Sequence, residues 1–263
     1  MGEVASERVV ILGAGRVSTH LVPALVKSGY RVAQVWSRTE VSARALAESL
    51  DLSYTDDLDA VIPDADIYIA CVADEALPEI AAKIVGRASR TALFLHTAGS
   101  VDMNIWQYGG AVHYGILYPL QTFSKERIVD MHEVTFFVEA SNEMSMERVE
   151  MLAHSLSSKV FHADSKCRER IHVAAVFACN FTNAMYTAAH ALLAKYNIPF
   201  EVLLPLIDET ASKVHMISPY DAQTGPAVRG DKAVMKKHIS ALSHDEVLSE
   251  MYMKISNYIV GNR

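Results

Sequence analysis

The sequence predicts an α/β fold with a mostly parallel sheet, followed by an all-helical C-terminal domain. In the first half of the chain, short apolar runs alternate with amphipathic segments, which is the pattern of strand–helix–strand units in a parallel sheet. From Asp164 onward the strand pattern is replaced by long helical stretches. A chain of 263 residues can bury two cores, and we place the domains at residues 1–163 and 164–263.

Composition narrows the classes of function. The apolar fraction of 51% and charged fraction of 21% are ordinary for a globular protein, and the net charge of −7 disfavours binding to a phosphate backbone. We therefore expect no nucleic-acid partner. No apolar stretch reaches the ~18 residues that span a bilayer, so we expect no membrane association. The three cysteines form neither a disulfide framework nor a metal-ligand pair, which predicts a cytoplasmic protein without a metal site.

The predicted elements of the first domain follow from these apolar runs and their spacing. The expected strands are residues 8–12, 31–36, 66–72, 91–95, 111–116, 134–139 and 159–162. The expected helices are residues 16–28, 41–50, 76–85 and 145–157. In the second domain we expect helices at residues 168–196 and 201–216, then a Pro/Gly-rich loop at 218–230. Asp231 can cap the next helix, and Ser243 with Glu246 has the spacing of a capping box for a last helix at 244–260.

A glycine-rich turn follows the first predicted strand and opens the first predicted helix. Its residues are Gly13, Ala14, Gly15, Arg16, Val17 and Ser18. The first glycine permits a tight turn, the second lets the backbone approach a pyrophosphate, and the helix N-terminus faces the phosphate charge. Ser18 is small enough for the third position, where glycine or alanine is preferred. This placement indicates a Rossmann-type dinucleotide site; the alternative is a glycine turn without a ligand.

The end of the second predicted strand distinguishes between the two dinucleotides. An NAD site has an acidic residue there, which binds the ribose 2′-hydroxyl. Here the residues are Trp36, Ser37, Arg38 and Thr39. A guanidinium pairs with phosphate through parallel N–H donors, and no carboxylate stands beside it to repel a 2′-phosphate. We therefore expect NADP(H) as the cofactor, with a merely solvated Arg38 as the alternative.

Further site residues are expected in the loops after the later strands, because ligands of open α/β sheets lie outside the carboxyl ends of the strands. We expect cofactor contacts from Cys71, Val72, Ala73, His96 and Thr97. Substrate contacts are expected from Gly99, Ser100 and Gln121. Histidine suits proton transfer near neutral pH, so His96 and His113 are candidate acid–base residues; the alternative is that they are structural.

The long helix predicted at residues 168–196 is apolar on most faces, which predicts burial against another surface such as a partner subunit. At 100° per residue, one polar seam falls within an arc of about 80°. Its members are His172, Asn180, Asn183, Thr187 and His190. The seam faces either a substrate or a hydrogen-bonded dimer core, because unpaired buried polar groups are costly. Arg229, in a later loop, is a candidate ligand for an anionic substrate, or it pairs with Asp231.

Several of these segments carry a resemblance to a known family. The stretches GAGRVSTHL, HTAGS, PLQTFS, HVAAVFACNFTN and TGPAVRGD resemble a bacterial group of Rossmann-like NADP oxidoreductases, in which an all-helical domain of unassigned function follows the nucleotide domain. The resemblance spans nearly the whole chain. More distantly, the chain is similar to pyrroline-5-carboxylate reductase, ketopantoate reductase and the β-hydroxyacid dehydrogenases. This implies a homodimer with its active site between the domains, and implies that Asn180 binds substrate.

The chain departs from the β-hydroxyacid dehydrogenases at one position. Those enzymes have a catalytic lysine one turn before the asparagine, where this chain has Val176, and no lysine occurs between Lys166 and Lys195. His96, His113 or His172 would then have to supply the proton. We expect an NADP(H)-dependent reductase of a small, anionic carbonyl or imine compound. A 2-oxo acid such as ketopantoate is implied by resemblance alone, and the alternative function is a non-catalytic NADP-binding sensor or interaction protein.

Overall fold

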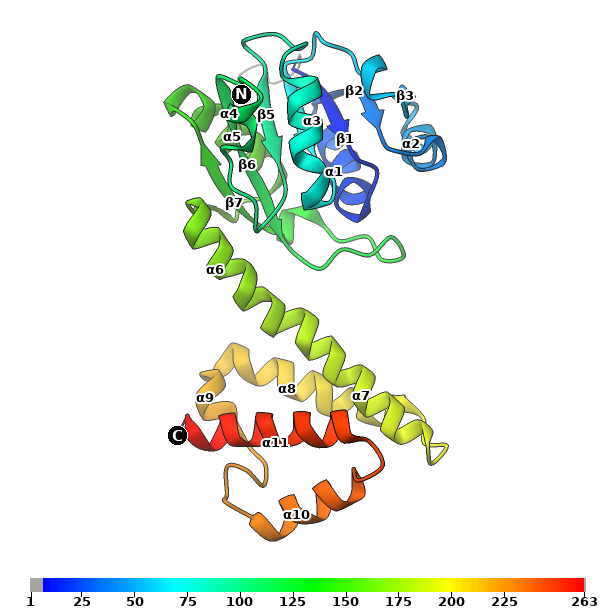
Figure 1. The fold of residues 1–263 in the computed structure, drawn as a ribbon, viewed down its shortest axis with the longest axis vertical. Coiled ribbons are helices and arrows are strands. Elements are labelled where there is room, and N and C mark those ends of the chain that lie inside the picture. The colour runs from blue at the N-terminus through cyan, green and yellow to red at the C-terminus, as the bar shows by residue number, and fades with distance from the viewer. Residues whose placement is uncertain (1–6, 263) are drawn as a thin grey trace. The chain divides into compact units, whose positions relative to one another are not determined.

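The computed structural model describes residues 7–262 and divides into two compact units between Cys179 and Asn180. The first unit contains one eight-stranded sheet, and the described part of the second contains only helices (Figure 1). The predicted α/β fold with a helical C-terminal region is confirmed. The helix after Ala163, which we expected to open the second domain, belongs by its contacts to the first unit.

The sheet has the doubly wound order of a Rossmann-type fold. Its strands are β1 Arg8–Leu12, β2 Arg31–Trp36, β3 Tyr54–Thr55, β4 Ile67–Ala70, β5 Leu93–His96, β6 His113–Leu120, β7 Thr135–Ala140 and β8 Val160–His162. They lie in the order β3-β2-β1-β4-β5-β6-β7-β8, and only β6 and β7 pair antiparallel. The order reverses between β1 and β4, which is where such sheets bind ligands.

Helices account for most of the remaining chain. In the first unit they are α1 Arg16–Lys27, α2 Glu40–Ala47, α3 Leu77–Ile84, α4 Ile105–Tyr108, α5 Glu143–Leu156 and α6 Ser165–Ala175. In the second unit they are α7 Thr182–Ala194, α8 Leu204–Met216, α9 Pro219–Ala222, α10 Lys232–Ala241 and α11 Glu246–Gly261. A π-helical segment, Val176–Phe181, joins α6 to α7.

Two apolar clusters cover the two faces of the sheet. Val9 and Ile11 of β1 belong to one cluster, with α1 and α5, whereas Val10 and Leu12 belong to the other, with α3 and α4. This alternation follows from the strand geometry, because successive side chains point to opposite faces. All four side chains are fully buried, as expected of a parallel strand covered on both sides.

The structure differs from the predicted elements at three places: two short elements were not predicted, and one predicted helix cap is wrong. The two-residue strand β3 and the one-turn helix α4 were not predicted, since neither is long enough to show a period. The last helix begins at Glu246 and its cap is Asp245, whose carboxylate accepts the Leu248 N–H at 3.0 Å. The proposed Ser243–Glu246 capping box is therefore wrong. Asp231 caps α10 as predicted, accepting the Val234 N–H at 3.1 Å.

The polar seam was drawn on a regular helix, and the structure interrupts it. The π-helical segment lies between His172 and Asn183 and adds residues to the turn, so one spacing of 100° per residue does not run through it. Thr187 donates to the Asn183 carbonyl at 3.1 Å, and the His190 ring packs edge-on against Phe200. These polar side chains therefore do not form one continuous stripe on a regular helix.

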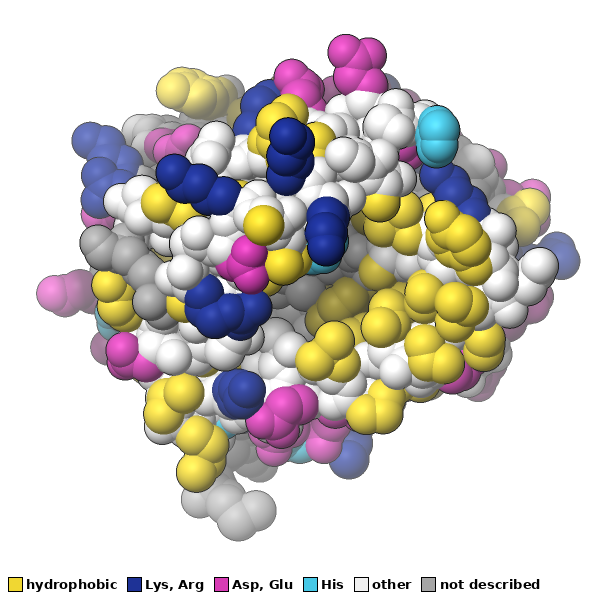
Figure 2. All heavy atoms as spheres, turned by 90° about the horizontal axis from the view of Figure 1, so that it is seen from below, with side chains coloured by type: hydrophobic (Ala, Val, Ile, Leu, Met, Phe, Trp, Pro, Cys, Tyr) yellow, Lys and Arg dark blue, Asp and Glu magenta, His cyan; other side chains and the backbone are white. Residues whose placement is uncertain are grey.

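The helical unit has almost no core of its own. Among residues 180–262, only Ala227 and Ser256 are buried. The unit contains an apolar cavity of about 400 Å³. Its walls are formed by Met185, Ala188, Ala189, Leu192, Thr224, Pro226, Ala227, His238, Leu242, Leu248, Met251, Tyr252, Ile255, Ser256 and Ile259. In the view of Figure 2, hydrophobic side chains gather around a hollow in the surface.

None of the helices within residues 7–262 combines the length and apolar character that crossing a bilayer requires.

Candidate functional site

The glycine turn packs closely against the ends of the neighbouring strands. Gly13 has φ +114, and a Cβ added there would lie 2.4 Å from the Cys71 carbonyl oxygen. Its N–H donates to the Trp36 carbonyl at 2.7 Å, which ties the end of β1 to the end of β2. Ser18 is fully buried and donates to the Gly13 carbonyl at 2.5 Å. The predicted tight turn and close helix packing are both present.

The N-terminus of α1 opens at this turn. Its N-cap is Gly15, no side chain caps it, and its first turn holds no acidic residue. The first backbone N–H groups of a helix lack intrahelical partners and carry a partial positive charge, which suits a phosphate. Burial raises the pKa of the adjacent Cys71 thiol to about 11, so no thiolate competes there at neutral pH. The residues present therefore fit a dinucleotide.

A cavity of about 660 Å³ extends from the glycine turn past the carboxyl end of β2. It is lined by Gly13, Ala14, Gly15, Trp36, Ser37, Arg38, Ser42, Asp56, Asp57, Leu58, Asp59, Cys71, Val72, Ala73, Ala76, Glu79, Ile80, Lys83 and Lys125. We call it the adenosine-side cavity, because in this fold the nucleoside lies next to the second strand. Its apolar walls and its mixed charges suit a base and a phosphorylated ribose.

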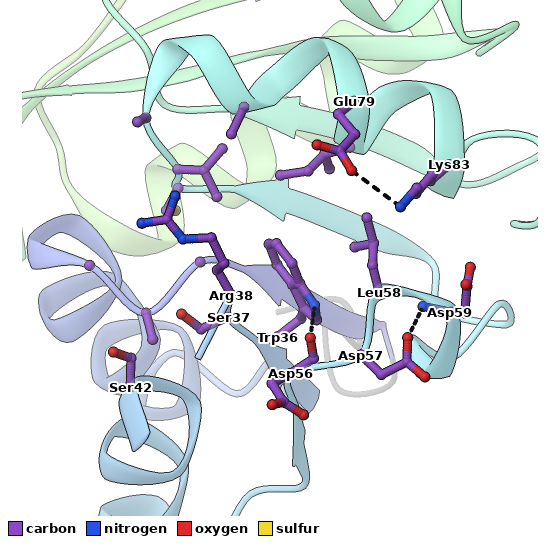
Figure 3. A pocket seen from close by; sticks show the side chains of 18 of the residues that line it. Trp36, Ser37, Arg38, Ser42, Asp56, Asp57, Leu58, Asp59, Glu79 and Lys83 are labelled. Carbon is purple, nitrogen blue, oxygen red and sulfur yellow. Dashed lines mark hydrogen bonds and ion pairs between the residues drawn. The ribbon is translucent and has the colours of Figure 1, made fainter. Parts of the chain in front are cut away.

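The charges of the adenosine-side cavity are not equivalent. Lys83 pairs with Glu79 at 3.1 Å, and Asp59 pairs with Arg87 at 3.3 Å. The Asp57 carboxylate accepts the Asp59 N–H at 2.8 Å. In Figure 3 the Arg38 guanidinium extends into the cavity, whereas the Asp56 carboxylate turns away from it. Arg38 is therefore a cation that faces this space without an acidic partner among residues 7–262, with the hydroxyls of Ser37 and Ser42 nearby, and Lys125 also lines the cavity.

A second cavity, of about 480 Å³, lies beyond β4 along the carboxyl ends of β5 and β6. It is lined by Gly15, Arg16, Val17, Cys71, Val72, Ala73, Asp74, Thr97, Ala98, Gly99, Tyr118, Pro119, Gln121, Phe123 and His172. We call it the reaction-side cavity. It shares Gly15 and the segment 71–73 with the adenosine-side cavity. One extended ligand crossing the switch point could therefore occupy both.

Most of the expected cofactor residues line one of these two cavities. Thr39 does not, and its hydroxyl instead donates to the Ser42 hydroxyl at 2.9 Å. Ser100 also lies outside them and donates to the Asp74 carboxylate. Asn180, Asn183 and Arg229 belong to the helical unit, where all three are exposed.

His96 is in the expected loop but is sealed in the protein. Its ring is fully buried and lines neither cavity. Its Nδ1 accepts the Ala98 N–H at 3.2 Å, so Nε2 carries the proton, and that nitrogen has no partner among residues 7–262. Burial, with help from the Arg168 charge, lowers the pKa of His96 to about 3. The geometry describes a neutral, structural imidazole.

The expectation that His113 lies at the carboxyl edge of the sheet is wrong. β6 begins at His113 and runs parallel to β5, so this histidine pairs with Leu93 at the opposite edge. Its Nδ1 lies 3.2 Å from the Ser145 hydroxyl. The strand was expected to end at Ile116 but continues to Leu120, which brings Tyr118 and Gln121 to the ligand edge instead.

A third histidine, His20, holds the loop that follows β6. Its Nδ1 accepts the Val129 N–H at 3.2 Å, so its Nε2 carries the proton and donates to the Ser124 carbonyl at 2.8 Å. The ring also packs on Phe123. This loop brings Phe123 to the reaction-side cavity and Lys125 to the adenosine-side cavity. The neutral imidazole therefore positions two lining residues that sequence reasoning missed.

The fold and these joined cavities define a Rossmann-type nucleotide-binding oxidoreductase class. A solved structure from Bacteroides fragilis, described as a "putative NADP oxidoreductase", shares 47% identity with the chain at a TM-score of 0.93, covering 98% of this chain and 99% of that one. The chain therefore belongs to the family of that protein, as the sequence motifs predicted.

Other comparisons match parts of the chain or its fold. A domain of unknown function, DUF2520, matches residues 134–259, and the shikimate/quinate 5-dehydrogenase family matches residues 1–95. A reductive aminase from Aspergillus terreus, in complex with NADPH and ethyl-5-oxohexanoate, is 16% identical with a TM-score of 0.70, covering 97% of this chain and 92% of that one. A 1-pyrroline-5-carboxylate reductase from Streptococcus pyogenes is 14% identical with a TM-score of 0.62, covering 97% and 98%. These two share the fold. No curated protein matches the chain.

Proposed function

We propose that this chain is an NADP(H)-dependent reductase of a small, anionic carbonyl or imine compound. The observation that carries the proposal is the pair of cavities joined at Gly15 and residues 71–73, which runs along the carboxyl ends of the strands across the switch point. Membership in an NADP oxidoreductase family supports it. A 2-oxo acid such as ketopantoate is the substrate class that the family resemblance favours.

Each part of the cofactor has a matching group of residues. The 2′-phosphate would lie at Ser37, Arg38 and Ser42, and the pyrophosphate at the glycine turn and the α1 N-terminus. The nicotinamide would enter the reaction-side cavity beside residues 97–99, and when bound it supplies a hydride. We keep Asn180, Asn183 and Arg229 of the helical unit as the proposed substrate ligands.

Substitution of Arg38 by alanine tests the cofactor assignment. We expect wild-type protein to bind NADPH at least ~10-fold (1.4 kcal/mol) more tightly than NADH. Arg38→Ala should remove most of that preference, because charge-assisted hydrogen bonds to phosphate are lost, while NADH binding stays unchanged. The measurement is a fluorescence titration of the purified protein with each nucleotide.

Arg44→Ala is the matched control, since Arg44 lies on α2, pairs with Glu48 at 3.4 Å and does not line the cavity. Equal affinity of the wild type for both nucleotides would contradict the assignment of NADP(H). If neither nucleotide binds, the reductase proposal fails altogether. Tight binding of NADPH without turnover of any carbonyl or imine compound would favour the non-catalytic sensor.

We also propose that the helical unit is covered by a second copy of the chain. An isolated unit with two buried residues among 83 cannot offset the conformational entropy of ordering its helices. Its exposed apolar side chains include Leu206 on α8 and Ile255 and Tyr258 on α11. A patch of this kind is typical of a permanent subunit interface.

Light scattering after gel filtration should therefore give the mass of a dimer for the wild-type protein. Ile255→Asp, in the wall of the apolar cavity, should shift the mass toward the monomer, because burying an unpaired carboxylate is costly. Val41→Asp is the control, since Val41 is a 78% exposed residue of α2 in the first unit. A monomeric wild-type protein at micromolar concentration would refute this interface.

A further inference from the structure

Tyr118 and His172 form a hydrogen-bonded pair in the wall of the reaction-side cavity. The Tyr118 hydroxyl lies 2.9 Å from His172 Nδ1, and their rings meet edge to face at 6.0 Å. Tyr118 comes from β6 and is 7% exposed, whereas His172 comes from α6 and is half-buried. Both residues belong to the first unit and line the same cavity.

The loop after β5 is shaped around this pair. A Cβ added to Gly99 would lie 2.7 Å from His172 Nδ1 and 3.0 Å from Tyr118 Cζ. Glycine is needed here for space, so that the loop backbone can approach both rings. The HTAGS segment therefore brings residues 97–99, where the nicotinamide is proposed to lie, directly against the hydroxyl.

The helix that carries His172 is fixed one turn earlier. Arg168 is fully buried, pairs with Glu139 of β7 at 2.6 Å and donates to the Val101 carbonyl at 2.5 Å. Ser165, which begins α6, donates to the same carboxylate at 2.8 Å. These contacts hold α6 on the sheet, and so hold the imidazole at a defined distance from the hydroxyl.

The protonation state of the hydroxyl suits a donor. Burial raises the pKa of Tyr118, and the nearby Arg168 charge opposes that rise, so the group is protonated at neutral pH and its anion is partly stabilised. The charged groups around the pair are Arg168 on α6, Glu139 on β7, and Asp74 and Arg16 in the cavity wall. A carbonyl oxygen that gains charge during reduction needs a proton from such a group.

We propose that Tyr118 is the proton donor of a carbonyl reduction, with His172 as the positioning residue that restores its proton. The inference rests on the proposed reductase function. The carbonyl carbon accepts the hydride, the C=O π bond breaks, and its electron pair takes the proton from the Tyr118 O–H. The Nδ1–H of His172 then donates a proton to the phenolate oxygen, and the ring takes up a replacement proton from solvent at Nε2. The products are an alcohol and the oxidised cofactor.

This pair also separates the two proposed substrate classes. An iminium ion already carries its proton, so its carbon accepts a hydride without any proton donor. A carbonyl cannot be reduced to an alcohol without one. A neutral imine would need a proton as a carbonyl does, so the Tyr118–His172 pair argues against a preformed iminium ion as substrate and suits carbonyl compounds, of which small 2-oxo acids match the proposed anionic class.

The test measures NADPH oxidation with glyoxylate, pyruvate and 2-oxoisovalerate, and with the cyclic imine 1-piperideine-2-carboxylate. We expect turnover of a 2-oxo acid, and a kcat at least ~100-fold lower in Tyr118→Phe with an unchanged Kd for NADPH. Tyr114→Phe is the matched control, since Tyr114 lies on the same strand and its hydroxyl donates to Asn104 at 3.2 Å. His172→Asn keeps a polar atom near the Tyr118 hydroxyl but cannot relay a proton to it, so kcat should fall while KM and the Kd for NADPH stay unchanged.

A readout without turnover comes from the histidine rings. In NMR spectra of the protein without nucleotide, the His172 Nδ1 signal should shift in Tyr118→Phe and remain unchanged in Tyr114→Phe. Unchanged kcat in Tyr118→Phe would overturn the donor role. Turnover of the imine alone, or binding of NADPH without oxidation by any of the four compounds, would overturn the assignment to 2-oxo acids. Failure of the wild type to bind NADPH would instead overturn the reductase function beneath it.

Discussion

Replacing Gly13 with alanine is expected to lower the free energy of unfolding by about 3 kcal/mol or more and to remove NADPH binding. Two costs add at this position. A non-glycine residue at φ +114 is strained by roughly 1–2 kcal/mol. The new Cβ would also stand 2.4 Å from the Cys71 carbonyl oxygen and 2.8 Å from its carbon, both of which are backbone atoms that cannot rotate away.

Alanine variants of two other glycines distinguish the cost of backbone strain from the cost of the Cβ clash. Each variant is measured by urea denaturation and by NADPH titration. Gly29 has φ +91 but no atom within 4 Å of its added Cβ, so Gly29→Ala should cost only about 1 kcal/mol from backbone strain. At Gly15 the nearest atom would be 3.8 Å away and φ is −86, so Gly15→Ala should fold normally. Its methyl group would nevertheless occupy the approach of the pyrophosphate, and NADPH binding should weaken more than ~10-fold.

Equal stability losses in Gly13→Ala and Gly29→Ala would show that the contact between β1 and the end of β4 can relax. In that case the conformation alone would explain the glycine. Normal NADPH binding by Gly15→Ala would show that the pyrophosphate does not approach this backbone, and the assignment of the adenosine-side cavity would then lose its main support.

The parts of the fold that were predictable are those with local signals. Arg8–Leu12 and Arg31–Trp36 were predicted with the bounds that the structure has, because each is an apolar run bounded by turn residues. β6 was expected to end at Ile116 but continues to Leu120, through Pro119, although proline is disfavoured inside strands. Beyond Ile116 this strand pairs only with β7, so the proline sits where one neighbour is missing.

The site was predictable where one loop carries it and not where distant segments meet. The glycine turn and Arg38 each directly follow a strand, so position along the chain was enough to predict that both line the adenosine-side cavity. Tyr118 and His172 are 54 residues apart, and nothing local to either residue marks the pair. The sequence shows only a glycine at position 99, and its contact with both rings becomes visible in the structure, where an added Cβ would lie 2.7 Å from His172 Nδ1. The choice between His96 and His172 likewise depended on burial, which the sequence alone did not decide.

Replacing Arg168 with methionine is expected to cost about 3–5 kcal/mol of unfolding free energy, because it leaves a buried carboxylate without its partner. The Glu139 side chain is only 15% exposed, and the arginine also satisfies the Val101 carbonyl at 2.5 Å. The measurement is urea denaturation of the whole protein, in which the unfolding transition of the first unit is monitored. Arg170→Met is the control on the same helix, where an exposed side chain should change stability by less than about 0.5 kcal/mol.

The double variant Arg168→Met with Glu139→Gln distinguishes an unpaired charge from a lost packing contact. Removing both charges eliminates the stranded carboxylate, so part of the loss should return, since buried ion pairs often contribute little net stability over apolar replacements. No recovery would mean that Arg168 acts mainly through the Val101 carbonyl and its own volume. Recovery of stability without recovery of the His172 Nδ1 signal would show that the ion pair serves to place α6, and hence the imidazole, against Tyr118. The buried arginine would then contribute to the geometry of proton transfer more than to the stability of the fold.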